Sequence, residues 1–90
     1  MVKLSQRLFN VSELITPGLK VADIGTDHGY LPIYLVENKI AETVIASDVK
    51  TGPLQKAADN INLYGLSDEI FYICVLCESY GYELRCFECS

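Results

Sequence analysis

The twelve residues VADIGTDHGYLP, residues 21–32, decide the fold class of this chain. An apolar run ends at Ile24 and is followed directly by Gly25, which is typical of a buried parallel strand that turns into a loop. The loop residues GTDHG precede an apolar segment in which Pro32 is tolerated only in the first turn of a helix. The stretch therefore predicts a strand, a glycine loop and a helix.

The sequence on both sides of this stretch continues the alternation of helix and strand. Apolar residues recur every three or four positions, which predicts a first helix over residues 6–16, capped by Ser5 and ended by Pro17. The further expected elements are a strand at 20–24, a helix at 29–38, a strand at 43–49, a helix from 51 to a C-cap at Gly65, and a strand at 71–76. This order predicts an α/β fold, the N-terminal part of a Rossmann-like, doubly wound domain with three parallel strands and an irregular tail.

Composition and charge narrow the class of protein further. The chain has 90 residues, of which 50% are apolar and 21% charged, as expected for one small globular domain. No apolar run approaches eighteen residues, and the N-terminal residues MVKLSQRLFNV lack the apolar core and cleavage site of a secretory signal. We therefore expect a cytoplasmic protein without a membrane span. Residues 1–65 carry seven acidic and six basic residues, whereas residues 66–90 carry five acidic residues and Arg85. The net charge of −5 therefore resides mostly in residues 66–90.

The glycine loop favours one type of ligand over another. Ligands of doubly wound sheets bind at the carboxyl ends of the strands, where this loop lies. Asp27 stands where the dinucleotide fingerprint has a glycine, and its carboxylate would repel a pyrophosphate. NAD and FAD are therefore disfavoured, whereas S-adenosylmethionine carries a sulfonium and an ammonium. Asp48 closes the next strand near the spacing at which an acid binds ribose hydroxyls, although an isolated acid is as often the polar end of a strand.

These residues carry a family resemblance. The segment ADIGTDHGYLP, preceded by LSQRL and followed by IASDVKTGPLQKAADNI, resembles the bacterial tRNA adenine(22)-N1 methyltransferase family over about residues 4–70. The resemblance implies a class I S-adenosylmethionine-dependent methyltransferase that acts on tRNA. It implies a chain without the acceptor pocket and the helical tRNA-holding domain, so we expect an N-terminal fragment with weak or no transferase activity alone. The cofactor-binding residues that it implies are Asp23, Gly25, Thr26, Asp27, His28, Gly29 and Asp48.

Two loop residues and two residues of the first helical segment are further candidates. Asp27 is a candidate catalytic residue, because a carboxylate could bind the exocyclic amine of an adenine and stabilise the charge that develops at N1. The alternative is that Asp27 contacts the cofactor or braces the loop, for instance by capping the helix that starts near Gly29. His28, the single histidine, is a candidate catalytic residue or a structural one. Arg7 and Lys3 are candidate contacts to tRNA phosphate, or else part of a solvated helix face.

The tail contains all four cysteines of the chain. Cys74 and Cys77, with Cys86 and Cys89, form two C-x2-C pairs, which is the pattern of a four-thiolate zinc site. However, only eight residues separate the pairs, and neither pair contains a glycine. Three interpretations stay open: a small non-catalytic zinc-stabilised binding module, reduced structural cysteines, or a tail from a frameshifted or prematurely ended reading frame.

The composition also suggests how the chain is divided and how it associates. Charge, tyrosine and cysteine content all change near residue 70, so we expect a partial S-adenosylmethionine-binding domain over residues 1–70 and a Cys-rich tail over residues 71–90. With only three strands in the expected sheet, an edge strand is left exposed, which would permit a homodimer.

Overall fold

The computed structural model describes residues 2–76 and 83–86, and its elements alternate as the sequence predicts. The helices are α1 (Gln6–Ser12), α2 (Tyr30–Glu37) and α3 (Thr51–Leu63), and the strands are β1 (Val21–Ile24), β2 (Val44–Asp48), β3 (Ile70–Leu76) and β4 (Glu83–Cys86). Among the described residues, none of the helices has the length and apolarity needed to cross a bilayer.

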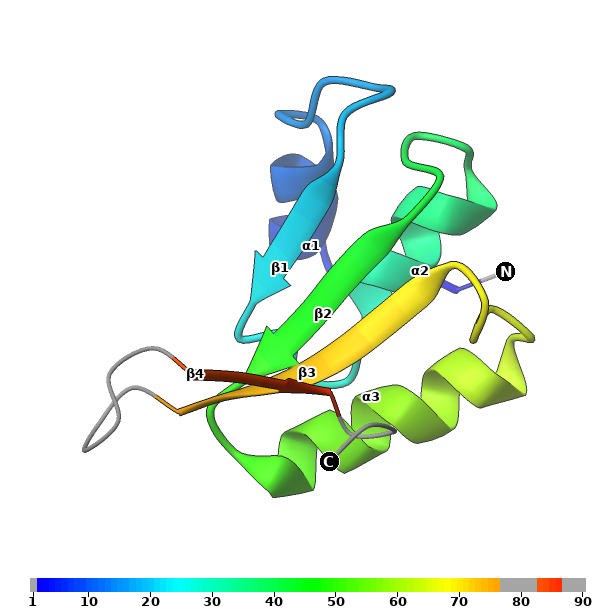
Figure 1. Cartoon of the computed structure of the whole chain (residues 1–90). Coiled ribbons are helices and arrows are strands. Elements are labelled where there is room, and N and C mark those ends of the chain that lie inside the picture. Colours follow the sequence, from blue (N-terminus) through cyan, green and yellow to red (C-terminus); the bar gives the residue numbers. More distant parts are fainter. Residues whose placement is uncertain (1, 77–82, 87–90) are drawn as a thin grey trace.

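The strands form one sheet in the order β1-β2-β3-β4 (Figure 1). β1, β2 and β3 are parallel, which confirms the predicted α/β fold, and β4 runs antiparallel to β3. The expectation of an irregular tail was wrong for Glu83–Cys86, which pairs with β3 in the register Ile73↔Cys86 to Leu76↔Glu83. A four-residue segment with two charged residues has no local pattern that predicts a strand; pairing with a distant strand decides its conformation.

Helix α1 begins where the sequence predicts and ends earlier. The Leu8 N–H donates to Ser5 Oγ at 3.3 Å, which confirms the N-cap. The helix stops at Ser12, whose hydroxyl donates to Phe9 O at 2.6 Å, and a tight turn with a bond from Ile15 N–H to Ser12 O follows. A side-chain hydroxyl that bonds to the preceding turn competes with the helical ladder, and the apolar spacing alone did not reveal this.

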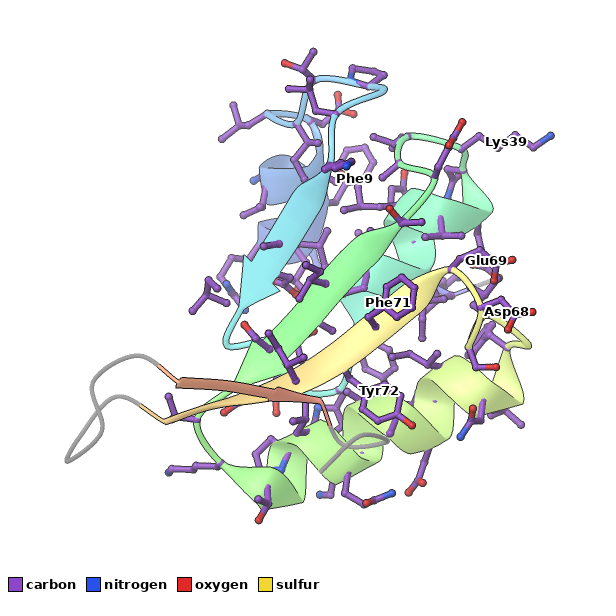
Figure 2. The ribbon with its side chains drawn as sticks, in the orientation of Figure 1. Phe9, Lys39, Asp68, Glu69, Phe71 and Tyr72 are labelled. Atoms are coloured by element: carbon purple, nitrogen blue, oxygen red, sulfur yellow. The ribbon has the colours of Figure 1, made fainter. Side chains whose placement is uncertain are left out.

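The three helices lie on one face of the sheet and leave the other face open (Figure 1). On the covered face, Val44 and Ile70 are 1% exposed and pack among apolar side chains of the helices. On the open face, Ala22, Ile45 and Phe71 are neighbours in one row across the three parallel strands. Figure 2 shows Phe71 on the open face of the sheet, whereas the adjacent Tyr72 points toward α3. The three helices therefore bury one face of the sheet and leave the other face exposed.

Candidate cofactor site

The loop between β1 and α2 is a tight turn held against the end of β2. The N–H groups of Gly25 and Thr26 both donate to Ser47 O at 2.8 Å, and Gly29 N–H donates to Thr26 O at 3.0 Å. Gly25 has φ +75° and Asp27 has φ +57°, the left-handed region that a non-glycine residue rarely adopts. Strained backbone of this kind is concentrated at functional sites.

The end of the loop packs closely against α3. A Cβ atom on Gly29 would lie 3.1 Å from the Cβ of Ala57, and Gly29 has φ +77°. Both the close contact and the left-handed backbone conformation therefore favour glycine at this position. Asn60 Nδ2 donates to His28 O at 2.9 Å. Gly29 is also the N-cap of α2 and no side chain caps this helix, so the interpretation of Asp27 as a helix cap is wrong.

Asp48 connects the loop with the end of β2. Its Oδ2 accepts a hydrogen bond from Asp27 N–H at 3.3 Å, and its Oδ1 accepts one from Lys50 N–H at 3.0 Å. Asp48 is half-buried, and each carboxylate oxygen keeps a lone pair for a further donor. The structure thus brings together the two acidic positions, 27 and 48, that the sequence places 21 residues apart.

A cavity of about 170 Å³ lies between α1 and the loop. Of the residues predicted for the site, the cavity is lined by Arg7, Asp23, Gly25, Thr26, Asp27 and His28. Gly29 packs on α3 instead, Asp48 is not among the lining residues but accepts a hydrogen bond from the loop, and Lys3 is exposed before the start of α1. The cavity therefore contains residues of the cofactor set together with Arg7.

The charges around the cavity are unbalanced. Burial raises the pKa of Asp23, and the nearby Asp48 carboxylate raises it further; the Thr26 hydroxyl and the Arg7 guanidinium oppose this shift. Although the Thr26 hydroxyl lies close enough to lower this pKa, its buried Oγ1 makes no hydrogen bond of good geometry with the described residues. A cationic ligand beside Asp23 would stabilise the ionised carboxylate and offset part of its desolvation.

The two candidate catalytic side chains are adjacent and accessible. His28 Nδ1 lies 3.3 Å from Asp27 Oδ2, and these side chains are 41% and 69% exposed. The His28 ring stacks on Tyr30 with a centroid distance of 5.4 Å and an interplanar angle of 10°. Both groups can reach a ligand at the mouth of the cavity, and their roles in catalysis stay predictions.

The zinc-site interpretation of the four cysteines gains no support from the described part of the chain. Cys74 and Cys86 belong to the paired strands β3 and β4, whereas Cys77 and Cys89 lie outside the described residues. Within residues 2–76 and 83–86, no group of three or more His, Cys, Asp or Glu residues is placed to hold a metal ion.

Some contributors to the site have no local signal in the sequence. Leu8 and Val11 of α1 line the cavity, and Asn60 of α3 braces the loop through His28 O. Their spacing within each helix is ordinary for packing residues. Only the way in which the helices pack on the sheet brings them to the loop.

Comparison with known proteins decides the family. A family model described as a methyltransferase domain matches residues 4–77. The chain belongs to this methyltransferase domain family. The tRNA (adenine(22)-N(1))-methyltransferase of Bacillus subtilis is 44% identical over 69 residues, which are 77% of this chain and 29% of that protein. This confirms the resemblance seen in the sequence.

Solved structures of relatives share the methyltransferase fold. The M. capricolum TrmK structure, in complex with S-adenosyl-homocysteine, has 45% identity and a TM-score of 0.78, covering 81% of this chain and 32% of that one. A Streptococcus pneumoniae protein in complex with S-adenosyl-L-methionine has 38% identity and a TM-score of 0.75, covering 78% of this chain and 33% of that one. The chain thus spans about a third of the length of these methyltransferases.

Proposed function

We propose that this methyltransferase domain binds S-adenosylmethionine at the carboxyl ends of β1 and β2. The observation that carries the proposal is the Asp48 carboxylate, which holds the strained loop through Asp27 N–H and keeps lone pairs for the two hydroxyls of a ribose. The hydrogen bonds from the loop to Ser47 O fix the position of the loop relative to the end of β2.

The cavity residues fit such a cofactor. The buried Thr26 Oγ1 lacks a well-aligned partner, and a Cβ atom on Gly25 would meet nothing within 4 Å, so the backbone of the loop is open to a ligand. Asp23 and Asp27 offer carboxylates to a ligand that carries positive charge. Relatives with 38–45% identity have been solved with S-adenosyl-homocysteine or S-adenosyl-L-methionine bound, which supports the same cofactor here.

We propose tRNA as the methyl acceptor, at N1 of an adenine. When bound, S-adenosylmethionine supplies a methyl group on a cationic sulfur; N1 forms the new bond to carbon while the carbon–sulfur bond breaks and its electron pair stays on sulfur. The Asp27 carboxylate would accept a hydrogen bond from the exocyclic amine and stabilise the positive charge of the methylated ring. His28, at 3.3 Å, would orient Asp27. The similarity to the Bacillus subtilis enzyme supports this acceptor, and with it a cytoplasmic location.

Calorimetric titration with S-adenosylmethionine tests the cofactor assignment. We expect the wild-type chain to bind, and Asp48→Ala to weaken binding by at least about tenfold, because charged hydrogen bonds to the ribose are lost. The matched control is Asp68→Ala, an exposed aspartate near the start of β3 (Figure 2). A wild-type chain that does not bind would overturn the cofactor assignment.

The acceptor is tested by transfer of a labelled methyl group to tRNA, followed by mass spectrometry of the nucleosides. We expect weak or no transfer by the chain alone, since it spans about a third of the length of its relatives. Any label that is transferred should appear as N1-methyladenosine and be lost in Asp27→Ala. Label in another nucleoside would contradict the proposed acceptor.

We also propose that a second copy associates through the outer edge of β1. β1 ends the strand order, and its residue Ala22 is exposed on the open face, so backbone groups and apolar surface adjoin. Sedimentation velocity over a range of concentrations should show association that Ala22→Lys abolishes and Leu63→Lys, on the exposed side of α3, does not. A wild-type chain that stays monomeric at all concentrations contradicts this assembly.

A further inference from the structure

Among the described residues that line the cofactor cavity, Arg7 is the one that is a lysine or an arginine. The other ionisable groups around the cavity are the carboxylates of Asp23 and Asp27, the imidazole of His28 and the phenol of Tyr30. A cavity with carboxylates and one guanidinium suits a zwitterion better than a purely cationic or purely anionic ligand. The amino-acid end of S-adenosylmethionine, with its ammonium and its carboxylate, is such a group.

The Arg7 guanidinium lies at the cavity, and its N–H donors are available to a ligand. Arg7 lowers the pKa of Asp23, so its charge acts on that carboxyl group. It forms no ion pair or hydrogen bond through its side chain with the residues whose side chains are described, 2–73. A guanidinium has five N–H donors in a planar fork that matches a carboxylate, and those of Arg7 are free for a ligand.

The position of Arg7 is fixed by its helix. Ser5 caps α1, and the adjacent Leu8 both lines the cavity and packs against the core formed by α2 and β2. Before the helix, Val2 N–H donates to Glu37 Oε1 at 3.0 Å, which ties the start of the chain to α2. The helix therefore presents Arg7 at the cavity from a packed support.

We propose that Arg7 binds the carboxylate of the amino-acid moiety of the cofactor, while the ammonium group of that moiety lies toward Asp23. This inference rests on the proposed function and adds a residue that selects ligands with an amino-acid carboxylate. It differs from the expectation that Arg7 contacts tRNA phosphate, which stays untested. The Thr26 hydroxyl, buried beside Asp23 and without a well-aligned partner, is a further donor for the same ligand group.

Titration with two ligands tests the proposal. S-adenosyl-homocysteine carries the amino-acid moiety, whereas 5′-methylthioadenosine has the same adenine, ribose and sulfur without it. We expect Arg7→Ala to weaken binding of S-adenosyl-homocysteine by about 10- to 100-fold and to leave the affinity for 5′-methylthioadenosine unchanged. Arg7→Lys should restore part of the loss, and Lys56→Ala, at an exposed position of α3, should match the wild type. Far-UV circular dichroism checks that each variant is folded.

The other outcomes are distinguishable. Equal loss for both ligands, or no loss for either, overturns the role of Arg7 while the cofactor site stands. Unchanged binding of S-adenosyl-homocysteine together with weaker tRNA retention in a filter assay assigns Arg7 to tRNA phosphate instead. A wild-type chain that binds neither ligand overturns both the cofactor assignment and the role of Arg7.

Discussion

The two faces of the sheet differ although they are built from the same strands. In β2, Val44 and Ala46 are 1% and 0% exposed, whereas Ile45 between them is 41% exposed. In β3, Ile70 is 1% exposed and Phe71 is 51% exposed. Parallel sheets are ordinarily covered on both faces, so the apolar residues of the open face have the composition of a core without its packing. We therefore expect the helix-covered face to contribute most of the free energy of unfolding.

The largest effect is expected in the covered core. Ile61→Ala removes a fully buried side chain of α3 and should lower the free energy of unfolding by about 3 kcal/mol, because it leaves a cavity. Leu63→Ala, two residues away and 79% exposed at that position, should change the free energy of unfolding by less than about 0.5 kcal/mol. Urea denaturation measures both. Similar losses for the two variants would show that the faces of α3 are not packed as described.

The contact between the loop and α3 should be the next most sensitive. Gly29→Ala forces a left-handed conformation on alanine and places its Cβ 3.1 Å from Ala57 Cβ, which should cost about 2 kcal/mol. Adding Ala57→Gly relieves the steric part and should recover some stability. Gly52→Ala is the control, because its Cβ would meet nothing and alanine favours the helix. Thermal unfolding should thus shift down for Gly29→Ala and not for Gly52→Ala.

A substitution on the open face should have little effect in dilute solution. Ile45→Thr keeps a β-branched side chain on a residue that is 41% exposed, so the free energy of unfolding should change by less than about 0.5 kcal/mol. Chemical denaturation at low protein concentration measures it. A loss above about 1.5 kcal/mol would mean that this face is buried in solution and would remove the contrast between the faces.

The subtlest effect concerns Asp23, which alternates with exposed Ala22 and Ile24 and so lies on the covered side of β1. Its folded pKa is raised by burial. Above about pH 4, where the unfolded carboxyl ionises, the folded state binds more protons than the unfolded state, so this group reduces stability as pH rises. Asp23→Asn should therefore gain melting temperature relative to the wild type from pH 3 to pH 7. Asp68→Asn, in an exposed turn, serves as the control, and parallel pH profiles for wild type and Asp23→Asn would contradict the prediction.

The sequence predicted most of the fold because its signals there are local. Apolar runs followed by glycine or an acid located β1 and β2 to within a residue or two. The C-cap of α3 is Tyr64, one residue before the predicted Gly65, which follows it with φ +69°. The end of α1 and the strand β4 were not predicted. The first depends on the Ser12 hydroxyl and the second on pairing with β3, which no local pattern encodes.

The candidate site was predicted only in part, because some of its residues carry local sequence signals and others come together only through packing. Glycine and acid spacing placed the loop and Asp48 at one end of the sheet, and the structure joins them by a hydrogen bond to Asp27 N–H. The packing of α1 against the loop puts Arg7 in the cavity, and the neighbour of Gly29 is Ala57. Both are contacts between residues distant in the chain, so they required three-dimensional coordinates.

The double hydrogen bond from Gly25 and Thr26 to Ser47 O has a consequence for evolution and for dynamics. Ser47 is 0% exposed and its hydroxyl donates to Asp23 O at 3.1 Å, so both the main chain and the side chain of Ser47 hold the turn and few other side chains fit at position 47. Release of the loop requires the end of β2 to separate from it. The two loop amides should therefore exchange with solvent deuterium at rates that report the opening of the β1–β2 pair, rather than the rapid exchange usual for a glycine turn.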